Sequence, residues 1–218
     1  MAEKIGVFLP TYTRPDLLRG CVLQWAAQSR CPDIIVIHQN GTPQSYEWCI
    51  SDLKDLLPCE WIFTPESPPQ SEWYRRPLQR LIELGCSHFF WADHDDIYLR
   101  DHVTTRLDEL DRYDFAISDR NSILFQSPSD YKFQARVNFT SHPAGGMSSS
   151  MAFNRKFALA LQQDFLDYPT MPYADQVVSK ITKPKFSSFV SKQQTTIYVS
   201  HAGSITSEIW LESALGKE

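Results

Sequence analysis

The sequence predicts an α/β fold with a mostly parallel central sheet that helices cover on both faces. Three observations lead to this prediction. Short apolar runs alternate with amphipathic segments over about the first 120 residues, the runs are apolar at nearly every position, and polar turns follow several of them. A strand between two helical layers must be apolar on both of its faces, as these runs are.

The first two expected elements are a strand and a helix. Ile5 to Leu9 is a short apolar run ending at Pro10, which is typical of a buried strand. The helix is expected to begin near Thr13, which can act as its cap, while Pro15 fits the first turn and Asp16 completes a T-x-x-D capping box. The residues that recur behind it at helical spacing are Leu17, Leu18, Cys21, Val22 and Trp25.

Strands and helices continue to alternate up to about residue 120. Buried strands are expected at 34–37, 60–63, 88–92 and 114–118. Helices are expected at 46–57, 78–84 and 103–110, with Gly85 ending the second of them. Three prolines predict a loop between the third strand and the helix at 78–84, namely Pro65, Pro68 and Pro69.

The alternation weakens after about residue 120. Antiparallel strands are expected at 123–125 and 131–137, a small-residue loop at 143–150, helices at 154–163 and 173–181, and a strand at 195–199. We expect a single domain over 1–218. It would consist of a strand-and-helix half (about 1–120) and a smaller antiparallel and helical half (about 121–218).

Composition and charge argue against several classes of protein. The net charge of −5 gives no basis for general nucleic-acid binding, which depends on many Lys and Arg contacts to phosphates. Five cysteines, an odd number without a CxxC pair, fit neither a disulfide framework nor a zinc site and favour a reducing cytoplasm. No apolar run approaches the roughly 20 residues that a transmembrane segment needs.

Polar turns follow three of the expected strands, at 11–14, 39–42 and 93–96. The carboxyl ends of parallel strands meet at one edge of a sheet, beside the N-termini of helices, and ligands of α/β proteins bind there. We therefore expect the three turns to share one edge and to form the binding site.

The turn Asp93-His94-Asp95-Asp96 places three carboxylates within four residues, directly after the apolar run Phe89 to Ala92. Such carboxylates repel one another unless a cation lies among them. Mg²⁺ and Mn²⁺ prefer oxygen ligands, typically one or two carboxylates completed by water and substrate phosphates. The alternative interpretation is a solvated acidic turn.

With these residues the chain resembles the family 2 glycosyltransferases of the GT-A fold. Residues 5–14 (IGVFLPTYTR) are similar to the family's opening strand and donor loop, and 89–96 (FFWADHDD) to the strand that ends in its DxD motif. The likeness covers the first half well and the second half in outline. It implies a GT-A-type domain in which the first half binds a nucleotide sugar, UDP- or another NDP-sugar, and the second half binds the acceptor.

The resemblance also implies an activity. The enzyme would transfer a sugar to a hydroxyl of a saccharide or lipid-linked acceptor, with Mn²⁺ or Mg²⁺ and with inversion, in polysaccharide or glycoconjugate biosynthesis. Its location would be cytoplasmic, with peripheral membrane contact possible.

Individual donor-side residues receive roles from the resemblance. Tyr12 would pack against the base, although an ordinary loop aromatic is the alternative. Asp93 would contact the ribose or help to orient the metal ion, Asp95 would be its principal ligand, and Asp96 a further ligand or a support behind it. The nucleotide pocket would be lined by Pro10, Thr11, Tyr12 and Arg14.

Two segments depart from the family's pattern. Gln39-Asn40-Gly41-Thr42 stands where the family carries an acidic residue that contacts the base, and amides at 39 and 40 can still hydrogen-bond a base edge. Residues 71–77 (SEWYRRP) replace another family segment. Arg75 or Arg76 could clamp a phosphate there, and a solvated basic helix start is the alternative.

The acceptor side offers further candidates. Asp175 matches the family's general base, although a helix N-terminal Asp is the alternative, and Asp164 and Asp167 are other candidates. His201 could complete the metal shell or be structural. Gly145 and Gly146 would belong to the acceptor-side loop or to a plain mobile loop.

Three other functions compete with glycosyl transfer. A nucleotidyltransferase acting on sugar phosphates usually carries a Gly-rich basic loop after the first strand, whereas residues 9–14 (LPTYTR) contain no glycine. A non-catalytic GT-A subunit fits the two altered segments. A metallohydrolase built on His94 and Asp95 would need further His and Asp ligands at motif spacing.

Overall fold

Seven strands form the central sheet of the computed structural model, which describes residues 3–119, 121–126, 133–139, 148–171 and 173–200. The strand order is β10-β6-β9-β4-β1-β2-β3. Among the described strands, β9 runs antiparallel to β4 and β6, and the remaining pairs of this sheet are parallel. The strands are β1 (Ile5–Thr11), β2 (Ile34–Asn40), β3 (Cys59–Thr64), β4 (His88–Trp91), β6 (Phe115–Ser118), β9 (Ala152–Asn154) and β10 (Ser188–Ser191).

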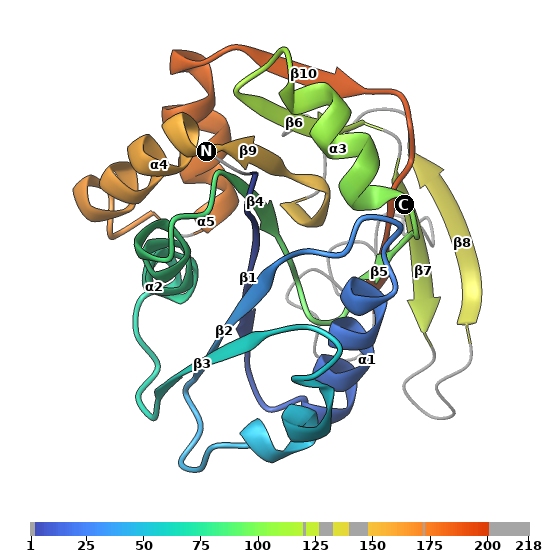
Figure 1. The fold of residues 1–218 in the computed structure, drawn as a ribbon, viewed down its shortest axis with the longest axis vertical. Coiled ribbons are helices and arrows are strands. Elements are labelled where there is room, and N and C mark those ends of the chain that lie inside the picture. The colour runs from blue at the N-terminus through green and yellow to red at the C-terminus, as the bar shows by residue number, and fades with distance from the viewer. Residues whose placement is uncertain (1–2, 120, 127–132, 140–147, 172, 201–218) are drawn as a thin grey trace, which may run out of the picture.

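A second, smaller sheet lies beside the first, at the right of Figure 1. Its order is β5-β11-β7-β8, formed by β5 (Ile97–Tyr98), β11 (Thr196–Ser200), β7 (Asn121–Gln126) and β8 (Phe133–Phe139). The antiparallel pair expected after residue 120 is confirmed by β7 and β8. Strand β11 pairs in parallel with β7 and antiparallel with β5. It therefore connects β5, which follows the turn at 93–96 that we call the acid turn, to the second half of the chain.

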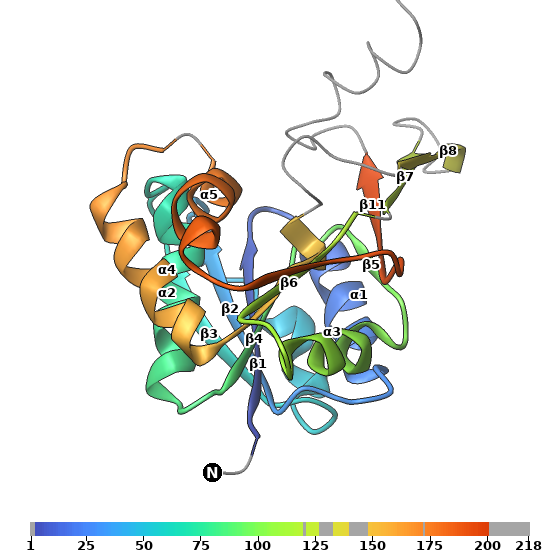
Figure 2. The ribbon, with the colours of Figure 1, turned by 90° about the horizontal axis from the view of Figure 1, so that it is seen from above.

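Helices cover both faces of the central sheet (Figure 2). One layer contains α1 (Pro15–Ala26), the 3-10 helix η1 (Glu47–Leu53) and α3 (His102–Leu110). The other contains α2 (Gln70–Glu83), α4 (Arg155–Asp167), α5 (Ala174–Gln176) and the π-helical η3 (Val177–Thr182), followed by η4 (Lys183–Lys185). A further 3-10 turn, η2 (Ser148–Ser150), precedes β9.

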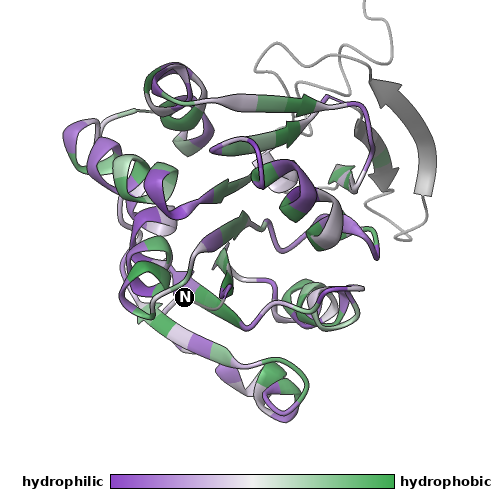
Figure 3. Cartoon of the chain, turned by 45° about the horizontal axis from the view of Figure 1, so that its top comes forward, coloured by the Kyte–Doolittle hydropathy of each residue, from purple (hydrophilic) through white to green (hydrophobic). Residues whose placement is uncertain are grey.

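Two apolar cores result from the alternation of side chains along the strands. Val7 and Leu9 of β1 face the α1 layer, whereas Phe8 between them faces the α2 layer. Figure 3 shows apolar stretches in the central strands and both apolar and polar stretches in the helices around them. The predicted α/β architecture, a mostly parallel sheet with helices on both faces, is confirmed.

The helix α2 corrects the prediction of a loop that extends to residue 77. It begins at Gln70 and contains Pro77, which has no N–H to donate to the carbonyl of Trp73. His38 Nδ1 lies 3.0 Å from that carbonyl oxygen, and His38 Nε2 lies 3.0 Å from Thr64 Oγ1. A histidine on β2 therefore replaces the missing helical hydrogen bond, which a sequence pattern does not reveal.

The predicted capping box at the start of α1 is wrong. Pro15 does occupy the first turn, but the N-cap residue is Arg14, whose side chain accepts no hydrogen bond from a backbone N–H of the first turn. Thr13 has a φ of 49°, in the left-handed region, so the chain turns sharply before the helix. The strands β9 and β10 were not predicted either, because three or four residues are too few for a period to show.

All five cysteines are free thiols. Among the described helices, none combines the length and the apolar character that crossing a bilayer requires.

Candidate functional site

The register of the parallel strands places the three polar turns at one edge of the sheet. Thr11 pairs with Gln39 between β1 and β2, and Phe8 pairs with Trp91 between β1 and β4. The chain leaves each of these strands within a few residues of the pairing, so the turns 11–14, 39–42 and 93–96 lie side by side. We call this the carboxyl edge.

Tyr12 lies on the backbone of the neighbouring turn. Gly41 has a φ of 67°, and a Cβ there would lie 2.8 Å from Cε2 of Tyr12, so a larger residue would strain the backbone and displace the ring. Tyr12 remains 49% exposed, which leaves an aromatic surface at the carboxyl edge.

The other residues expected in the nucleotide pocket differ in accessibility. Thr11 is buried and its hydroxyl lies 2.9 Å from that of Tyr46, so it holds the loop below the edge. Pro10 is buried within β1, and Arg14 is half-buried at the start of α1. Of this set, Tyr12 and Arg14 are the residues with surface left for a ligand.

The two amides of the turn at 39–42 behave differently. Gln39 uses its whole side chain within the turn, since Nε2 donates to Thr42 and to the Gln44 carbonyl, and Oε1 accepts from the Tyr46 N–H. Asn40 is 1% exposed, and neither amide atom has a hydrogen-bond partner among the described residues. Gln39 therefore supports the turn, and Asn40 retains unused hydrogen-bonding capacity.

Asp93 is held by a set of donors from three elements. Its Oδ1 accepts from Tyr74 Oη at 3.1 Å and from Trp91 Nε1 at 3.3 Å, and its Oδ2 accepts from Ser148 Oγ at 2.9 Å. Its backbone is fixed by Tyr98, whose hydroxyl accepts from the Asp93 N–H at 2.7 Å. Sequence reasoning did not place Tyr74, Tyr98 and Ser148 against Asp93, because α2, β5 and η2 approach the turn only in the folded chain.

The three carboxylates of the acid turn oppose one another. Burial, with the neighbouring Asp95 charge, raises the pKa of Asp93 to about 6. Burial also raises the pKa of Asp96 well above its ordinary value, with added effects from Asp95 and Asp93. A cation beside Asp93 and Asp95 would relieve this repulsion.

Asp96 is directed toward the second sheet. It is 2% exposed, its Oδ1 accepts from the Val199 N–H at 3.0 Å, and its Oδ2 has no hydrogen-bond partner among the described residues. The predicted role of Asp96 as a ligand thus competes with a bond that anchors β11 to the turn.

The carboxylates of the turn at 93–96 fit a divalent ion that the phosphates of a bound nucleotide also hold. Carboxylate oxygens are suitable donors for Mg²⁺ and Mn²⁺, but the described residues include no group of three or more His, Cys, Asp or Glu side chains arranged around an ion. The predicted ligand His201 and the loop glycines Gly145 and Gly146 lie outside the described residues. One or two carboxylates completed by phosphate oxygens would suit this turn.

The two arginines of α2 are engaged within the protein. Arg75 pairs with Glu72 and donates to Gln79 Oε1 at 2.8 Å. Arg76 pairs with Glu72 at 3.1 Å and donates to Thr64 Oγ1 at 2.9 Å. A phosphate contact by either would require it to exchange these partners.

Asp175 belongs to α5, which contacts α2, the helix that carries Tyr74. Burial raises the pKa of Tyr74 well above its ordinary value, and the carboxylates of Asp93, Asp175 and Asp95 raise it further. Of the three carboxylates, Asp93 accepts directly from the Tyr74 hydroxyl, and Asp175 and Asp95 act on it through their charge. Helix α5 is tied to α2 by the Ala174 N–H, which donates to Gln70 Oε1 at 3.1 Å.

The two other candidates for the base have different surroundings. Asp164 is 4% exposed and pairs with Lys185 at 2.7 Å, while Thr182 donates to it at 2.8 Å. Asp167 is exposed near the end of α4 and accepts from Gln163. These contacts give both residues structural explanations.

Solved structures of one enzyme share this architecture. The chain superposes on S. aureus TarS, residues 1–349, in complex with UDP with a TM-score of 0.64 at 11% identity, covering 90% of this chain and 60% of that one. The chain has the GT-A fold. The TarS complex with UDP-GlcNAc gives 0.63 at 10% identity, over 92% of this chain and 60% of that one, and a longer TarS structure gives 0.62 at 11% identity over 90% and 36%.

The match confirms the GT-A resemblance expected from the sequence, because TarS is a family 2 glycosyltransferase of this fold. At such identity the likeness establishes the fold alone, and the chain spans 60% or less of the TarS chains. No protein-family model and no curated protein matches the sequence. In the GT-A fold of this chain, the Asp93 turn lies at the carboxyl edge, where ligands of α/β sheets bind.

Proposed function

We propose that this chain is a glycosyltransferase that moves a sugar from a nucleoside-diphosphate sugar to a hydroxyl acceptor with inversion. One observation carries the proposal. Tyr74 donates to the Asp93 carboxylate at the carboxyl edge, and the charges of Asp175 and Asp95, from two distant parts of the sequence, act on the same hydroxyl. The TarS complexes contain UDP and UDP-GlcNAc, which supports a uridine nucleotide as the first donor to examine.

In this proposal, each residue of the carboxyl edge has its own role. Tyr12 packs against the base, Asn40 hydrogen-bonds a polar edge of the base or ribose, and Asp93 holds the ribose or the ion. Asp95 is the principal ligand for Mn²⁺ or Mg²⁺. When bound, the ion supplies neutralisation of the negative charge that gathers on the departing diphosphate.

Asp175 accepts the proton of the acceptor hydroxyl. The acceptor oxygen then forms its bond to the anomeric carbon from the face opposite the diphosphate. The bond between that carbon and the diphosphate oxygen breaks, and its electron pair leaves with the nucleoside diphosphate. Attack from the opposite face inverts the anomeric configuration. The acceptor would be a saccharide or lipid-linked hydroxyl compound, in polysaccharide or glycoconjugate assembly.

Asp175→Asn tests the assignment of the base. Loss of a general base typically lowers a rate by about 10² to 10⁴-fold, whereas the donor does not depend on it for binding. We expect sugar transfer from UDP-GlcNAc, or from another donor found active, to fall in this range. The dissociation constant of UDP with Mn²⁺, measured by calorimetry, should change less than about twofold.

Asp167→Asn is the matched control, because Asp167 is an exposed carboxylate of the same half. Normal transfer by Asp175→Asn would refute the assignment of Asp175. A non-catalytic GT-A subunit is the second candidate, which the internal pairing of Arg75 and Arg76 favours. That protein would show neither transfer nor donor hydrolysis, and no metal-dependent binding of a nucleotide.

A further inference from the structure

An aromatic pair, Tyr74 and Trp91, constrains the Asp93 carboxylate at the carboxyl edge. Tyr74 stacks on Trp91 with ring centroids 4.1 Å apart and an interplanar angle of 30°. Their polar atoms, Tyr74 Oη and Trp91 Nε1, converge on the same oxygen, Oδ1 of Asp93. Stacking fixes the two donors relative to each other, so they set the direction of this carboxylate.

The pair is itself supported from below. Phe8 of β1 contacts both rings edge-on, with centroids 6.5 Å from Tyr74 and 5.2 Å from Trp91. Trp91 belongs to β4, which precedes the acid turn, and Tyr74 belongs to α2, which α5 contacts through Gln70. The pair therefore spans from the strand that carries the acid turn to the helix beside Asp175.

We propose that Tyr74 is a positioning residue for the donor, whose hydroxyl orients the Asp93 carboxylate toward a nucleoside diphosphate and its divalent ion. This inference rests on the proposed function. Without the hydroxyl, the Asp93 side chain keeps the donors Trp91 and Ser148 but loses the restraint from α2. Positioned ligands bind more tightly because less ordering is required on binding.

A second consequence concerns the proton of the Tyr74 hydroxyl. The hydroxyl donates to Asp93 and also experiences the charge of Asp175. The phenol thus directs its single proton to the donor-side carboxylate. Phenylalanine at this position would preserve the stacked ring and remove only the proton donor.

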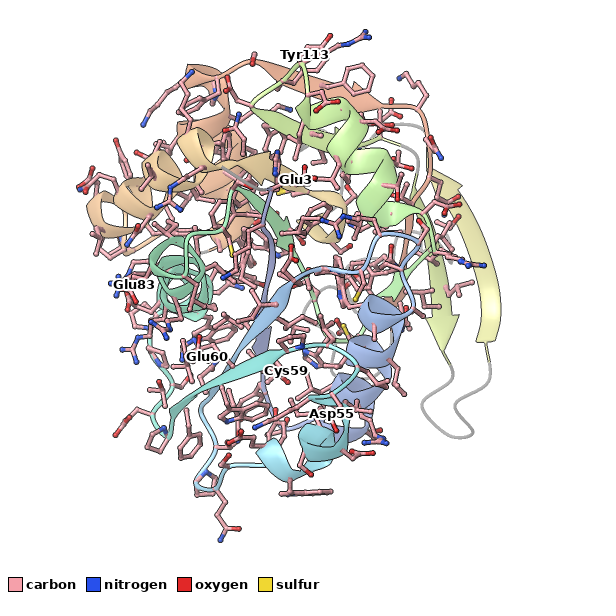
Figure 4. The ribbon with its side chains drawn as sticks, viewed as in Figure 1. Glu3, Asp55, Cys59, Glu60, Glu83 and Tyr113 are labelled. Atoms are coloured by element: carbon pink, nitrogen blue, oxygen red, sulfur yellow. The ribbon has the colours of Figure 1, made fainter. Side chains whose placement is uncertain are left out.

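Titration of UDP into the protein with saturating Mn²⁺, well below the melting temperature, tests the inference. We expect Tyr74→Phe to weaken UDP binding about tenfold, the usual effect of losing one hydrogen bond to a charged group. Tyr113→Phe is the matched control. Tyr113 also stacks on an aromatic ring, that of Phe189 at 5.1 Å, but lies beside the opposite end of β6, at the top of Figure 4.

The outcomes separate this inference from the proposed function. If the wild type binds UDP and Tyr74→Phe binds it with the same dissociation constant, the role of Tyr74 is overturned and the proposed function stays intact. Absence of binding by the wild type to UDP and to other nucleoside diphosphates would overturn both. Near-UV circular dichroism and calorimetric stoichiometry verify that Tyr74→Phe is folded. A merely structural role of Tyr74 would lower the melting temperature of this variant without changing its UDP dissociation constant.

Should Tyr74→Phe fail to fold, Trp91→Phe provides the second test. It keeps an aromatic ring for Tyr74 to stack on and removes the other donor to Asp93 Oδ1. A weaker UDP affinity of folded Trp91→Phe supports positioning by the pair, and an unchanged affinity contradicts it.

Discussion

Two turns at the carboxyl edge use their polar residues in opposite ways. In the acid turn, 93–96, neighbouring carboxylates raise one another's pKa, and Asp96 keeps an oxygen without a partner among the described residues. In the amide turn, 39–42, Gln39 makes three hydrogen bonds within its own loop. Just before it, His38 completes the helix α2 at Pro77.

This difference separates groups that serve a ligand from groups that serve the fold. A polar side chain whose bonds are complete stabilises the chain and offers little to a ligand. Charges that repel one another destabilise the chain and are retained where a counterion or substrate compensates them. Substitutions in the acid turn should therefore affect binding, and substitution of Gln39 in the amide turn should affect stability.

The largest effect is expected from Asp95→Ala. Removal of the principal ligand should weaken UDP binding in Mn²⁺ by more than about a hundredfold, since supporting groups alone contribute 10- to 100-fold to metal affinity. The free energy of unfolding without metal should stay equal or rise, because one repelling charge is lost. Calorimetry and urea unfolding measure the two quantities, and a loss of stability would contradict the repulsion.

Gln39→Ala should show the opposite result. It leaves the Tyr46 N–H and other polar groups of the loop without partners, at a cost of about 2 to 3 kcal/mol in the free energy of unfolding. The UDP dissociation constant should change less than about threefold in the folded protein, as expected for a residue that contacts no ligand. Gln44→Ala is the control, because its exposed side chain takes no part in these bonds. Greater loss of affinity than of stability would place Gln39 in the pocket.

The pH dependence of stability should differ in sign between Asp93 and His38. The folded-state pKa of Asp93, raised to about 6 from 3.8, means that its contribution is present below pH 3.8 and lost as the pH rises through about 6. Burial lowers the pKa of His38 below 6.5, so its contribution is present above pH 6.5 and lost as the pH falls.

Metal-free Asp93→Asn should therefore gain stability over the wild type between pH 4 and 7, by at most about 2 kcal/mol. His38→Asn should lose more stability at pH 7.5 than at pH 5, by roughly 1 kcal/mol. Urea unfolding across pH measures both slopes. Parallel pH profiles for wild type and Asp93→Asn would show that Asp93 is not perturbed.

The sequence was sufficient to predict the parallel sheet and the edge shared by the turns, because apolar runs and the residues that follow them are local signals. Local signals also marked Asp93 to Asp96. The partners of Asp93 were beyond reach, since Tyr74 and Ser148 come from segments 19 and 55 residues away. The helix through Pro77 is not predicted for the same reason, because His38, which replaces the missing hydrogen bond, lies on a strand distant in the sequence.

The most direct test of the account is a thermal-shift measurement on the wild type with UDP, with Mn²⁺, with both and with neither. A ligand that binds only the native state raises its melting temperature, and the acid turn needs both the ion and the diphosphate to be neutralised. We predict a rise of about 5 °C with UDP and Mn²⁺ together and less than about 1 °C with either alone. Equal melting temperatures in all four conditions, repeated with other nucleoside diphosphates, would contradict the claim that the acid turn binds a nucleotide through a divalent ion.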